Sequence, residues 1–410
     1  MHILVVTQYY WPENFRINDL TIGLVEHGHQ VTVLTGIPNY PEGQYFNGYG
    51  LFKKQRQEYK GVQIIRVPLI PRGGGRGVRL AVNYLSFTIS ACLCMPLLIS
   101  KKFDLIFICQ LSPITVALPA LLLKKMLTIP AIMWVLDLWP ESLTAINAVK
   151  SKLIIKKIDQ LVRFIYRHCD RIIVASDGFI PSICEKGIES KKIGSFPNWY
   201  EPEYRKELNK ELPLHITIPE GFVVMFAGNI GSAQSFETIL SAAENTLEFA
   251  DIHWVIVGNG RQAKYVKAEV SARNLSRTVH LLGSFSPDFM PAFFARADVM
   301  LVTLKRDPIF SLTIPGKIQS YLACGKPIVA SLDGEGGQLI EKSGAGLVCR
   351  AEDPNGLANA ILALYRMPPE QRQQMGLKGK LYCEENFNRD MLLNRLDDWM
   401  KEVAIQVDSR

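Results

Sequence analysis

The sequence has few residues of the kinds that bind structural metal ions. Its eight cysteines are scattered over 410 residues, and none shows the paired spacing of a zinc site. We therefore predict reduced, buried thiols and no metal site, as in a cytosolic protein.

Two nucleotide-binding motifs are also missing. No segment completes the dinucleotide fingerprint G-x-G-x-x-G, and the chain contains no Walker lysine motif. The nearest segments, Gly228-Asn-Ile-Gly231 and Gly258-Asn-Gly260, both break the fingerprint. A dinucleotide cofactor and an NTP-hydrolysing loop are disfavoured, and we expect no cofactor.

The N-terminus lacks the basic start of a signal peptide, and residues 2–7 already have the pattern of a strand. Charged residues make up 21% of the chain, which excludes a polytopic membrane protein. One uncharged run, residues 80–100, is long enough to span a bilayer. Because the strands before and after this run must join one sheet, we predict instead a helix half buried against the sheet, with its outer side in one leaflet.

The excess of positive charge is small. The chain has 46 Lys and Arg residues against 39 Asp and Glu residues, a formal net charge of +7. This balance suits an anionic ligand or an anionic membrane surface, and it is too diffuse to indicate nucleic-acid binding.

Short apolar runs alternate with helical patterns along the whole chain, which predicts the α/β class with two Rossmann-like halves. We predict an N-terminal domain over residues 1–196, a hinge over 197–214, a second domain over 215–386, and a helix over 387–410 that crosses back to the first domain. The expected strands are 2–7, 30–35, 63–67, 105–109, 131–136 and 171–175 in the first half, and 222–227, 253–257, 279–282, 299–304, 327–331 and 346–349 in the second.

Ligands of doubly wound sheets bind beyond the carboxyl ends of the strands, so the loops there are the first candidates. In the second half, glycine-bearing loops contain Gly228 with Asn229, Gly258 with Asn259, and Gly283. A fourth such loop, residues 334–337, contains Glu335. Each glycine alone is explained by a tight turn, but four such loops on one edge predict a pocket for phosphate and sugar.

Lys317 lies near the start of a predicted helix, where the helix dipole disfavours a cation. We predict that Thr313 caps this helix and that Pro315 stands in its first turn. A phosphate docked against the free amides would account for the lysine; the other interpretation is a solvated surface lysine.

Two loops of the first half carry polar side chains after a predicted strand. Glu13 and Asn14 can hydrogen-bond hydroxyl groups and Arg16 can neutralise a phosphate, or the same residues form a capped helix start with a solvated arginine. Asp137 could orient a sugar hydroxyl or act as a base, or it could cap the next helix.

Basic residues lie close to the uncharged run. A glycine-rich loop contains Arg72, Arg76 and Arg79. The helix predicted for residues 150–167 has Ile154, Ile158, Leu161, Val162 and Ile165 on one face, and Lys152, Lys156, Arg163 and Arg167 on another. An ordinary packed helix explains this pattern by itself. Together with the other two features it indicates monotopic attachment to an anionic surface.

Segment 315–327, Pro-Gly-Lys-Ile-Gln-Ser-Tyr-Leu-Ala-Cys-Gly-Lys-Pro, resembles a motif of the retaining GT-B sugar transferases of glycosyltransferase family 4. With the two-domain layout, the resemblance covers nearly the whole chain. Segments 2–16 and 137–142 resemble the O-antigen and colanic-acid branch, and an L-N-acetylfucosaminyltransferase in particular.

The resemblance implies a metal-independent enzyme that moves N-acetyl-L-fucosamine, or a related deoxyhexose, from a UDP-sugar to an undecaprenyl-diphosphate-linked saccharide in O-antigen or exopolysaccharide assembly. It would work at the cytoplasmic face of the inner membrane, with the donor on the C-terminal domain and the acceptor on the N-terminal domain. The catalytic candidates are Asp137, Lys317 and Arg16.

The chain departs from the family pattern at three positions. The family carries two glutamates eight positions apart, and Ser311 and Gln319 occupy these places here. Gln319 can still bond a ribose, whereas Ser311 cannot act as a carboxylate. Asn229 stands near the place of the family's phosphate-binding arginine, which leaves Lys317 as the main phosphate cation. Two further donor contacts are implied by the resemblance, Phe285 near the base and Glu335 facing the donor.

Two other functions fit the same architecture. One is a nucleotide-sugar 2-epimerase, which needs acid and base carboxylates over the sugar ring and no lipid-facing surface. The other is a polysaccharide-assembly scaffold that lost its activity together with the glutamate and the arginine. An assay of donor hydrolysis or sugar transfer distinguishes the three.

Overall fold

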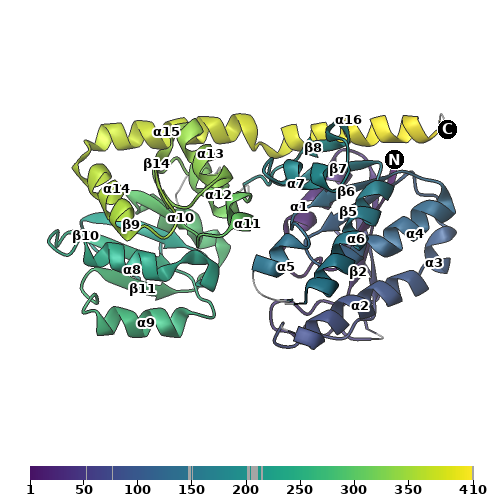
Figure 1. Ribbon diagram of the computed structural model, residues 1–410, viewed down its shortest axis with the longest axis horizontal. Coiled ribbons are helices and arrows are strands. Elements are labelled where there is room, and N and C mark those ends of the chain that lie inside the picture. The colour runs from purple at the N-terminus through teal and green to yellow at the C-terminus, as the bar shows by residue number, and fades with distance from the viewer. Residues whose placement is uncertain are drawn as a thin grey trace. The chain divides into compact units, whose positions relative to one another are not determined.

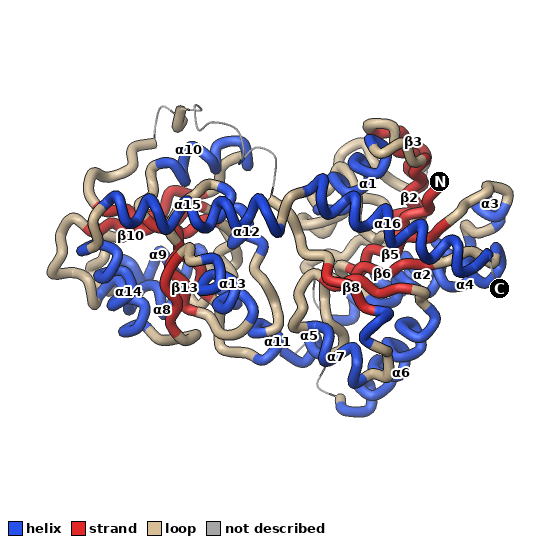
Figure 2. Tube along the Cα trace, turned by 90° about the horizontal axis from the view of Figure 1, so that it is seen from above, coloured by secondary structure: helices blue, strands red, loops and turns tan. Residues whose placement is uncertain are grey.

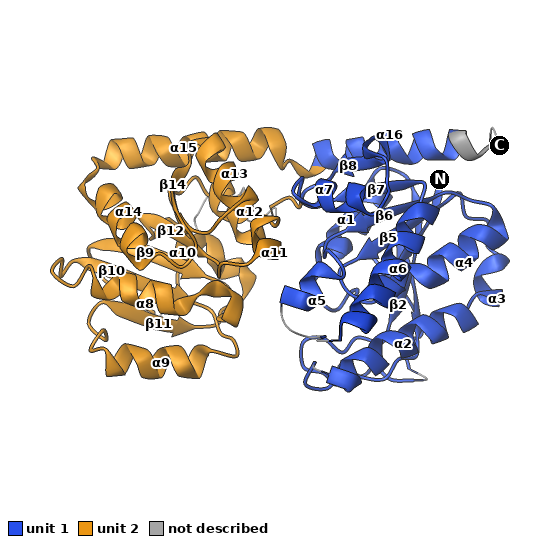
Figure 3. Ribbon diagram, viewed as in Figure 1, with its two compact units in different colours: residues 1–197, 390–410 blue, residues 198–389 orange. Residues whose placement is uncertain are grey.

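The computed structural model describes residues 1–51, 53–75, 77–145, 149, 151–200, 204, 211–213 and 216–408. The chain forms two compact units (Figures 1 and 3). Unit 1 contains Met1–Pro197 and Asp390–Arg410, and unit 2 contains Asn198–Arg389. The chain therefore leaves unit 1 after Pro197 and returns to it for its last helix.

Unit 1 contains an eight-stranded sheet with the order β3-β4-β2-β1-β5-β6-β7-β8, parallel throughout except for the pair β3 and β4. The central strands are continuous apolar runs that are buried on both faces, as parallel strands between helix layers are. The strands are β1 (His2–Val6), β2 (Gln30–Gly36), β3 (Arg56–Tyr59), β4 (Val62–Val67), β5 (Leu105–Gln110), β6 (Ala131–Val135), β7 (Arg171–Val174) and β8 (Ile193–Ser195).

The helices of unit 1 include the last helix of the chain. Among them, α4 contacts α2, α3 and α6. Helix α16 runs beside β7 and β8 (Figures 1 and 2), where the Trp399 ring lies 6.2 Å from that of Phe196. Asp397 of α16 also accepts a hydrogen bond from His29 at 2.8 Å. The helices are α1 (Arg16–Glu26), α2 (Gly77–Leu93), α3 (Pro96–Ile99), α4 (Ala117–Leu127), α5 (Glu141–Ala145), α6 (Lys152–His168), α7 (Phe179–Glu185) and α16 (Arg389–Asp408).

Unit 2 contains a six-stranded parallel sheet with the order β11-β10-β9-β12-β13-β14. Helices cover both faces of this sheet, and each face has its own apolar core. Helices α8, α9 and α14 pack on one face, and α10, α12, α13 and α15 pack on the other. The strands are β9 (Phe222–Ala227), β10 (Ile252–Val257), β11 (Val279–Gly283), β12 (Val299–Thr303), β13 (Ile328–Ser331) and β14 (Gly346–Cys349). The helices are α8 (Phe236–Glu244), α9 (Ala263–Ala272), α10 (Met290–Ala295), α11 (Pro308–Ser311), α12 (Gly316–Ala323), α13 (Glu335–Ser343), α14 (Pro354–Arg366) and α15 (Pro369–Asn386).

The predicted fold class is confirmed: two Rossmann-like parallel sheets, with a C-terminal helix that packs in the first unit. Every predicted strand is present. The sequence analysis missed β3 and β8, because β3 is a polar edge strand and β8 contains only three residues.

The uncharged run 80–100 was predicted to form one helix, but it forms two. It forms most of α2 and the short α3, and the break falls before Pro96, which starts the second helix. Helix α2 buries Asn83, Phe87 and Ala91 and exposes Leu85 and Ile89, so it is half buried as expected. In the part of the chain that the structure describes, no helix has the length and apolar character needed to cross a bilayer.

Candidate functional site

Three glycine-bearing loops meet at the carboxyl edge of the unit 2 sheet. The Gly228 amide donates to the Val257 carbonyl at 2.9 Å, and the Gly258 amide donates to the Gly283 carbonyl at 2.7 Å. A Cβ atom on Gly258 would lie only 1.9 Å from the Gly228 carbonyl oxygen. The packing of the loops on one another thus requires Gly258, and a ligand contact of these glycines stays a prediction.

Asn229 and Asn259 are exposed at the same edge. The Asn259 side chain accepts from the Gly260 amide at 2.7 Å, and its carbonyl accepts from the Ile230 amide at 2.9 Å. Asn259 therefore holds the loop after β10 against the loop after β9. The loop after β11 has Gly283 exposed, while the Phe285 ring packs 4.8 Å from that of Phe293 of α10.

Helix α12 starts at Gly316, with Pro315 as its N-cap. The prediction that Thr313 caps this helix is wrong, because the Thr313 hydroxyl donates to the Ile309 carbonyl at 2.7 Å. The Pro315 carbonyl accepts from the Ile318 amide at 2.9 Å, but a proline side chain offers no acceptor, so no side-chain cap bonds the amides of Gly316 and Lys317. The N-terminus of α12 is therefore suited to an anion, as was predicted.

The Lys317 side chain reaches from the first turn of α12 to the loop after β9. Its ammonium donates to the Gln234 side-chain oxygen at 2.8 Å and lies 3.8 Å from the centroid of the Phe226 ring. A Cβ on Gly228 would lie 3.5 Å from it. Burial lowers the pKa of Lys317 to about 7, since it separates the ammonium from water. Sequence reasoning missed Gln234 and Phe226, which carry no motif.

Ser311 and Gln319 occupy the places of the family glutamates, and their side chains bond different carbonyl groups. The Ser311 hydroxyl donates to the Pro308 carbonyl at 2.7 Å, and the Ser311 carbonyl touches Gly334, at the start of α13. Gln319 is only 1% exposed; with the amide assigned by its hydrogen bonds, it donates to the carbonyls of Pro315 and Gly316 at 3.2 and 3.1 Å. A ribose contact of Gln319 stays a prediction, and it requires this amide to turn outward. Glu335 begins α13, where the helix dipole favours a carboxylate.

In unit 1, Glu13 is buried and bonds backbone amides, a setting that neither of its two sequence interpretations included. The residue is 2% exposed, and its carboxylate accepts from the amides of Asn39 and Tyr40, both at 2.7 Å, and of Tyr10 at 3.2 Å. Burial raises the pKa of Glu13 to about 7 even though three amides favour the carboxylate. Glu13 therefore joins the loops after β1 and β2 instead of binding hydroxyl groups, while Asn14 next to it is exposed.

Above Glu13, three aromatic rings gather around an arginine. The Tyr9 and Phe15 rings stack at 5.3 Å, and the Tyr40 ring lies 5.2 Å from Phe15. The Arg72 guanidinium lies 4.8 Å from the Tyr40 centroid, and the Arg72 amide donates to the Asn39 side chain at 3.1 Å. We call Tyr9, Phe15, Tyr40 and Arg72 the aromatic cluster.

Three other arginines, Arg16, Arg76 and Arg79, were predicted near this edge. Arg16 is the first residue of α1, and the Arg79 guanidinium donates to the Pro71 carbonyl at 3.4 Å. Arg76 lies outside the described residues.

Asp137 follows β6 at the carboxyl edge of the sheet. Its carboxylate accepts from the Trp139 indole at 2.9 Å, and burial raises the pKa of Asp137. Trp139 lies next to Tyr84 of α2, with ring centroids 6.4 Å apart. The structure therefore shows Asp137 bonded to an indole N–H, and a contact with a sugar stays a prediction.

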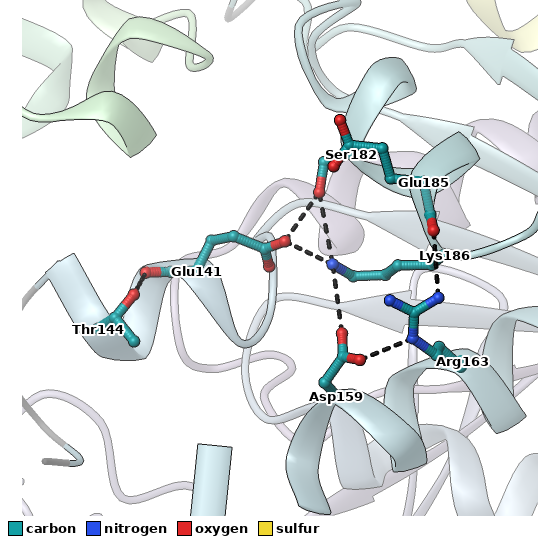
Figure 4. Close-up of polar contacts among 7 residues, drawn as sticks. All are labelled: Glu141, Thr144, Asp159, Arg163, Ser182, Glu185 and Lys186. Atoms are coloured by element: carbon teal, nitrogen blue, oxygen red, sulfur yellow. Dashed lines mark hydrogen bonds and ion pairs between the residues drawn. The ribbon is translucent and has the colours of Figure 1, made fainter. Parts of the chain in front are cut away.

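A charged network fixes the helix that follows Asp137 (Figure 4). At the start of α5, Glu141 accepts from Lys186 at 2.5 Å and from Ser182 at 2.8 Å. The Lys186 ammonium also lies 3.6 Å from Asp159 of α6, and Asp159 pairs with Arg163 at 2.6 Å. The network thereby joins α5, α6 and α7.

Two predictions for α6 change in the structure. Arg163 pairs with Asp159 and donates to the Glu185 carbonyl at 3.1 Å, so its charge is partly compensated within the network although its side chain is 37% exposed. Ile154 was predicted on the buried face, but it is 51% exposed because α6 packs only through its C-terminal half. Lys152, Lys156 and Arg167 are exposed, as expected for a basic face.

Two protein-family models match the chain. Residues 14–199 match the model of the glycosyl transferase 4-like domain, and residues 221–367 match the model of the group 1 glycosyl transferases. Together the two matches include most of the chain and both units.

Curated relatives agree with the models. The putative colanic acid biosynthesis glycosyl transferase WcaI of Escherichia coli K12 is 26% identical over 414 residues, which cover 96% of this chain and 98% of WcaI. The probable glycosyltransferase WbjE of Pseudomonas aeruginosa is 30% identical over 238 residues, 56% of this chain and 58% of WbjE.

Solved structures share the fold. The chain of Anabaena Alr3699/HepE in complex with UDP superposes with a TM-score of 0.71 at 14% identity, over 98% of this chain and all of HepE. Sucrose-phosphate synthase of Thermosynechococcus elongatus gives 0.71 at 17% identity, over 98% of both chains.

We expect Glu13→Ala to lower the free energy of unfolding by about 2 kcal/mol or more, because it leaves three buried amides without an acceptor. The urea midpoint of the full chain measures this change. Asn14→Ala, at the exposed neighbouring position, is the matched control and should leave the midpoint unchanged. Equal midpoints for the two variants would contradict the structural role of Glu13.

Proposed function

Because the chain belongs to the group 1 glycosyltransferases with the GT-B fold, we propose that it transfers a sugar from a UDP-sugar to an undecaprenyl-diphosphate-linked saccharide in the assembly of a cell-surface polysaccharide. The relative WcaI, named for colanic acid biosynthesis, supports the pathway class. The sugar that we propose is N-acetyl-L-fucosamine or a related deoxyhexose, transferred with retention of configuration at the cytoplasmic face of the inner membrane.

The observation that carries the proposal is the Lys317 ammonium beside the loop after β9, in the first turn of α12. A diphosphate docked at this edge would meet one cation and the amides at a helix N-terminus, as anion sites commonly provide. The HepE structure with UDP supports this class of donor. Gly228, Asn229, Gly258, Asn259 and Gly283 would then surround the nucleotide diphosphate, and Thr313 and Glu335 would lie near the sugar.

The chemistry follows from the leaving group. Sugar transfer releases UDP, so negative charge grows on the β-phosphate as the bond to the sugar breaks. A fixed cation and oriented amides stabilise that charge without reorganising. We propose that Lys317 and α12 supply this stabilisation in a metal-independent reaction, in place of the family arginine for which Asn229 stands.

The acceptor would bind to unit 1. Sugar rings stack on aromatic faces, and a guanidinium matches a phosphate in geometry, so the aromatic cluster suits the saccharide and the diphosphate of a lipid-linked acceptor. Asp137 and Arg16 are the further catalytic candidates of this unit. For Asp137, burial favours the protonated form, which could donate to a sugar oxygen.

A lipid-linked acceptor requires contact with a membrane, and unit 1 has a suitable surface. Exposed apolar side chains gather on α2, α3, α4 and α6, which pack together around α4. Water-soluble monomers rarely expose so many large apolar side chains on one group of elements. We call these side chains the apolar face; they are Val78, Leu85, Ile89, Leu93, Leu97, Ile99, Leu122, Met126, Leu153, Ile154 and Phe164.

The first test is to incubate the purified protein with a panel of nucleotide sugars and an undecaprenyl-diphosphate-linked acceptor and to identify the product by mass. We expect transfer from a UDP-sugar, and Lys317→Ala should lower turnover by at least roughly tenfold, the effect of one charge-assisted contact. Lys342→Ala removes an exposed lysine from the last turn of α13 and should leave turnover unchanged. A product that is an epimerised nucleotide sugar would identify a 2-epimerase, and no turnover with any donor would favour a scaffold.

We also expect UDP to bind less tightly as the pH rises above about 7, because the Lys317 pKa in the free protein is about 7 and only the protonated amine attracts a phosphate. The affinity should fall by up to about tenfold per pH unit until the pH reaches the pKa that Lys317 has in the complex with UDP. Calorimetry in buffers of different ionisation enthalpy should show proton uptake on binding. Lys317→Met should bind UDP weakly with no such uptake; uptake that persists in this variant would show that another group titrates.

We expect Leu85→Asn with Ile89→Asn to lower the flotation of the protein with phosphatidylcholine vesicles, because the two side chains are 53% and 58% exposed on α2 of the apolar face. Leu377→Asn with Leu381→Asn is the matched control. This pair has the same spacing on α15 of unit 2 and is 53% and 52% exposed. If both double variants float equally, the apolar face does not contact the bilayer.

A further inference from the structure

A groove lies between the C-terminal ends of α4 and α6 in unit 1, and it encloses about 1390 Å³. It is lined also by the residues that precede β6 and β7, Ile129 and Asp170. It therefore opens at the amino ends of the strands, at the opposite edge of the sheet from Asp137 and the aromatic cluster. Neither the proposed donor site nor the proposed acceptor site includes any of its residues.

One half of the groove is apolar. Leu118 and Leu122 stand one turn apart on α4, and Phe164 stands on α6 across from them. Leu121 and Ile188 are buried beneath. Leu122 and Phe164 also belong to the apolar face, so the apolar wall of the groove continues into that surface.

The other half of the groove is basic. Its lining has six Lys and Arg side chains, Lys124, Lys125, Arg167, Arg171, Lys191 and Lys192, against the carboxylates of Asp170 and Glu189. The excess of positive charge lies next to an apolar wall, and this combination matches a negatively charged amphiphile better than a small soluble anion.

Several of these cations have structural partners. Lys124 pairs with Asp170 at 2.5 Å, and Arg171 pairs with Glu402 at 2.6 Å. Lys192 donates to the carbonyls of Tyr166 and Arg167 at the end of α6, and Lys191 pairs with Glu189 at 2.7 Å.

Two cations remain available at the groove. Lys125 and Arg167 are exposed and have no ion-pair partner within the described ranges. Lys125 comes three residues after Leu122 on α4, and Arg167 comes three residues after Phe164 on α6. Each wall of the groove therefore has an apolar residue followed, one helical turn later, by a free cation.

We propose that this groove binds one anionic membrane lipid, with the phosphate between Lys125 and Arg167 and the start of an acyl chain along Leu118, Leu122 and Phe164. The charge of the walls selects an anionic headgroup, and the continuity with the apolar face favours a lipid over a soluble phosphate. The proposal deepens the proposed function, on which it rests for the contact of unit 1 with a membrane. The lipid is not the acceptor: it binds at the other edge of the sheet and makes membrane binding depend on lipid charge.

The test measures flotation of the full chain with vesicles of phosphatidylcholine alone and of phosphatidylcholine with phosphatidylglycerol. We expect phosphatidylglycerol to increase binding of the wild type. Lys125→Glu with Arg167→Glu should remove that increase, lowering the partition to the anionic vesicles by at least about tenfold, while binding to neutral vesicles is kept. Lys264→Glu with Lys267→Glu, exposed on α9 of unit 2, makes the same change in net charge and should float as the wild type does.

Three outcomes would overturn the proposal. The first is an equal gain from phosphatidylglycerol in the groove variant and the wild type. The second is an equal loss in the α9 control, which would indicate net charge alone. The third is displacement of the protein from anionic vesicles by inorganic phosphate at constant ionic strength, which would indicate a site for a soluble anion.

The same variants are assayed for sugar transfer to the acceptor in detergent micelles. The groove variant should retain wild-type turnover there, which also shows that it is folded. If the wild type itself transfers no sugar in micelles, the proposed function fails, and the flotation result still decides the groove.

Discussion

The arrangement of the whole molecule depends on one constraint of parallel sheets: all strands of a sheet end at the same edge, so the loops that follow them must pack together there. In unit 2 this packing is backbone on backbone, and the amide of Gly258 bonds the carbonyl of Gly283 while its α-carbon touches Gly228. In unit 1 the loops are joined by a side chain, since the carboxylate of Glu13 bonds amides from two different loops. The same constraint thus has two chemical solutions in one chain.

Both edges contain charged groups that are separated from water, and their partners explain their different roles. Lys186 is buried with two carboxylates nearby and acts as the centre of a structural network. The Lys317 ammonium has a neutral amide oxygen and an aromatic ring as neighbours, so its charge is poorly compensated. A partly buried cation with incomplete compensation is suited to an anionic ligand, which supplies the missing charge.

The sequence predicted the elements well and the side-chain partners poorly. Apolar runs such as that of β5 identify buried strands because covering helices exclude water from both faces. The N-cap of α12 was wrong by two residues, because Thr313 bonds back to Ile309 and Pro315 alone sets the helix start. The structural role of Glu13 was not predicted, because the amides that donate to its carboxylate belong to residues 26 and 27 positions away. The partners of Lys317 and the Glu185 carbonyl that Arg163 bonds likewise come from segments distant in sequence, and no local pattern indicates them. The pair of Asp159 and Arg163 differs, because its i, i+4 spacing on one helix is a local pattern.

The environment of Lys317 has a consequence for its chemical reactivity. An amine with a pKa of about 7 is about half unprotonated at neutral pH, whereas an ordinary lysine is almost entirely an ammonium ion. The free amine is the nucleophilic form, so Lys317 is at neutral pH a better intrinsic nucleophile than an ordinary lysine towards any acylating reagent that reaches it. Lys317 therefore combines two properties: its protonated form attracts an anion, and its unprotonated form is a nucleophile.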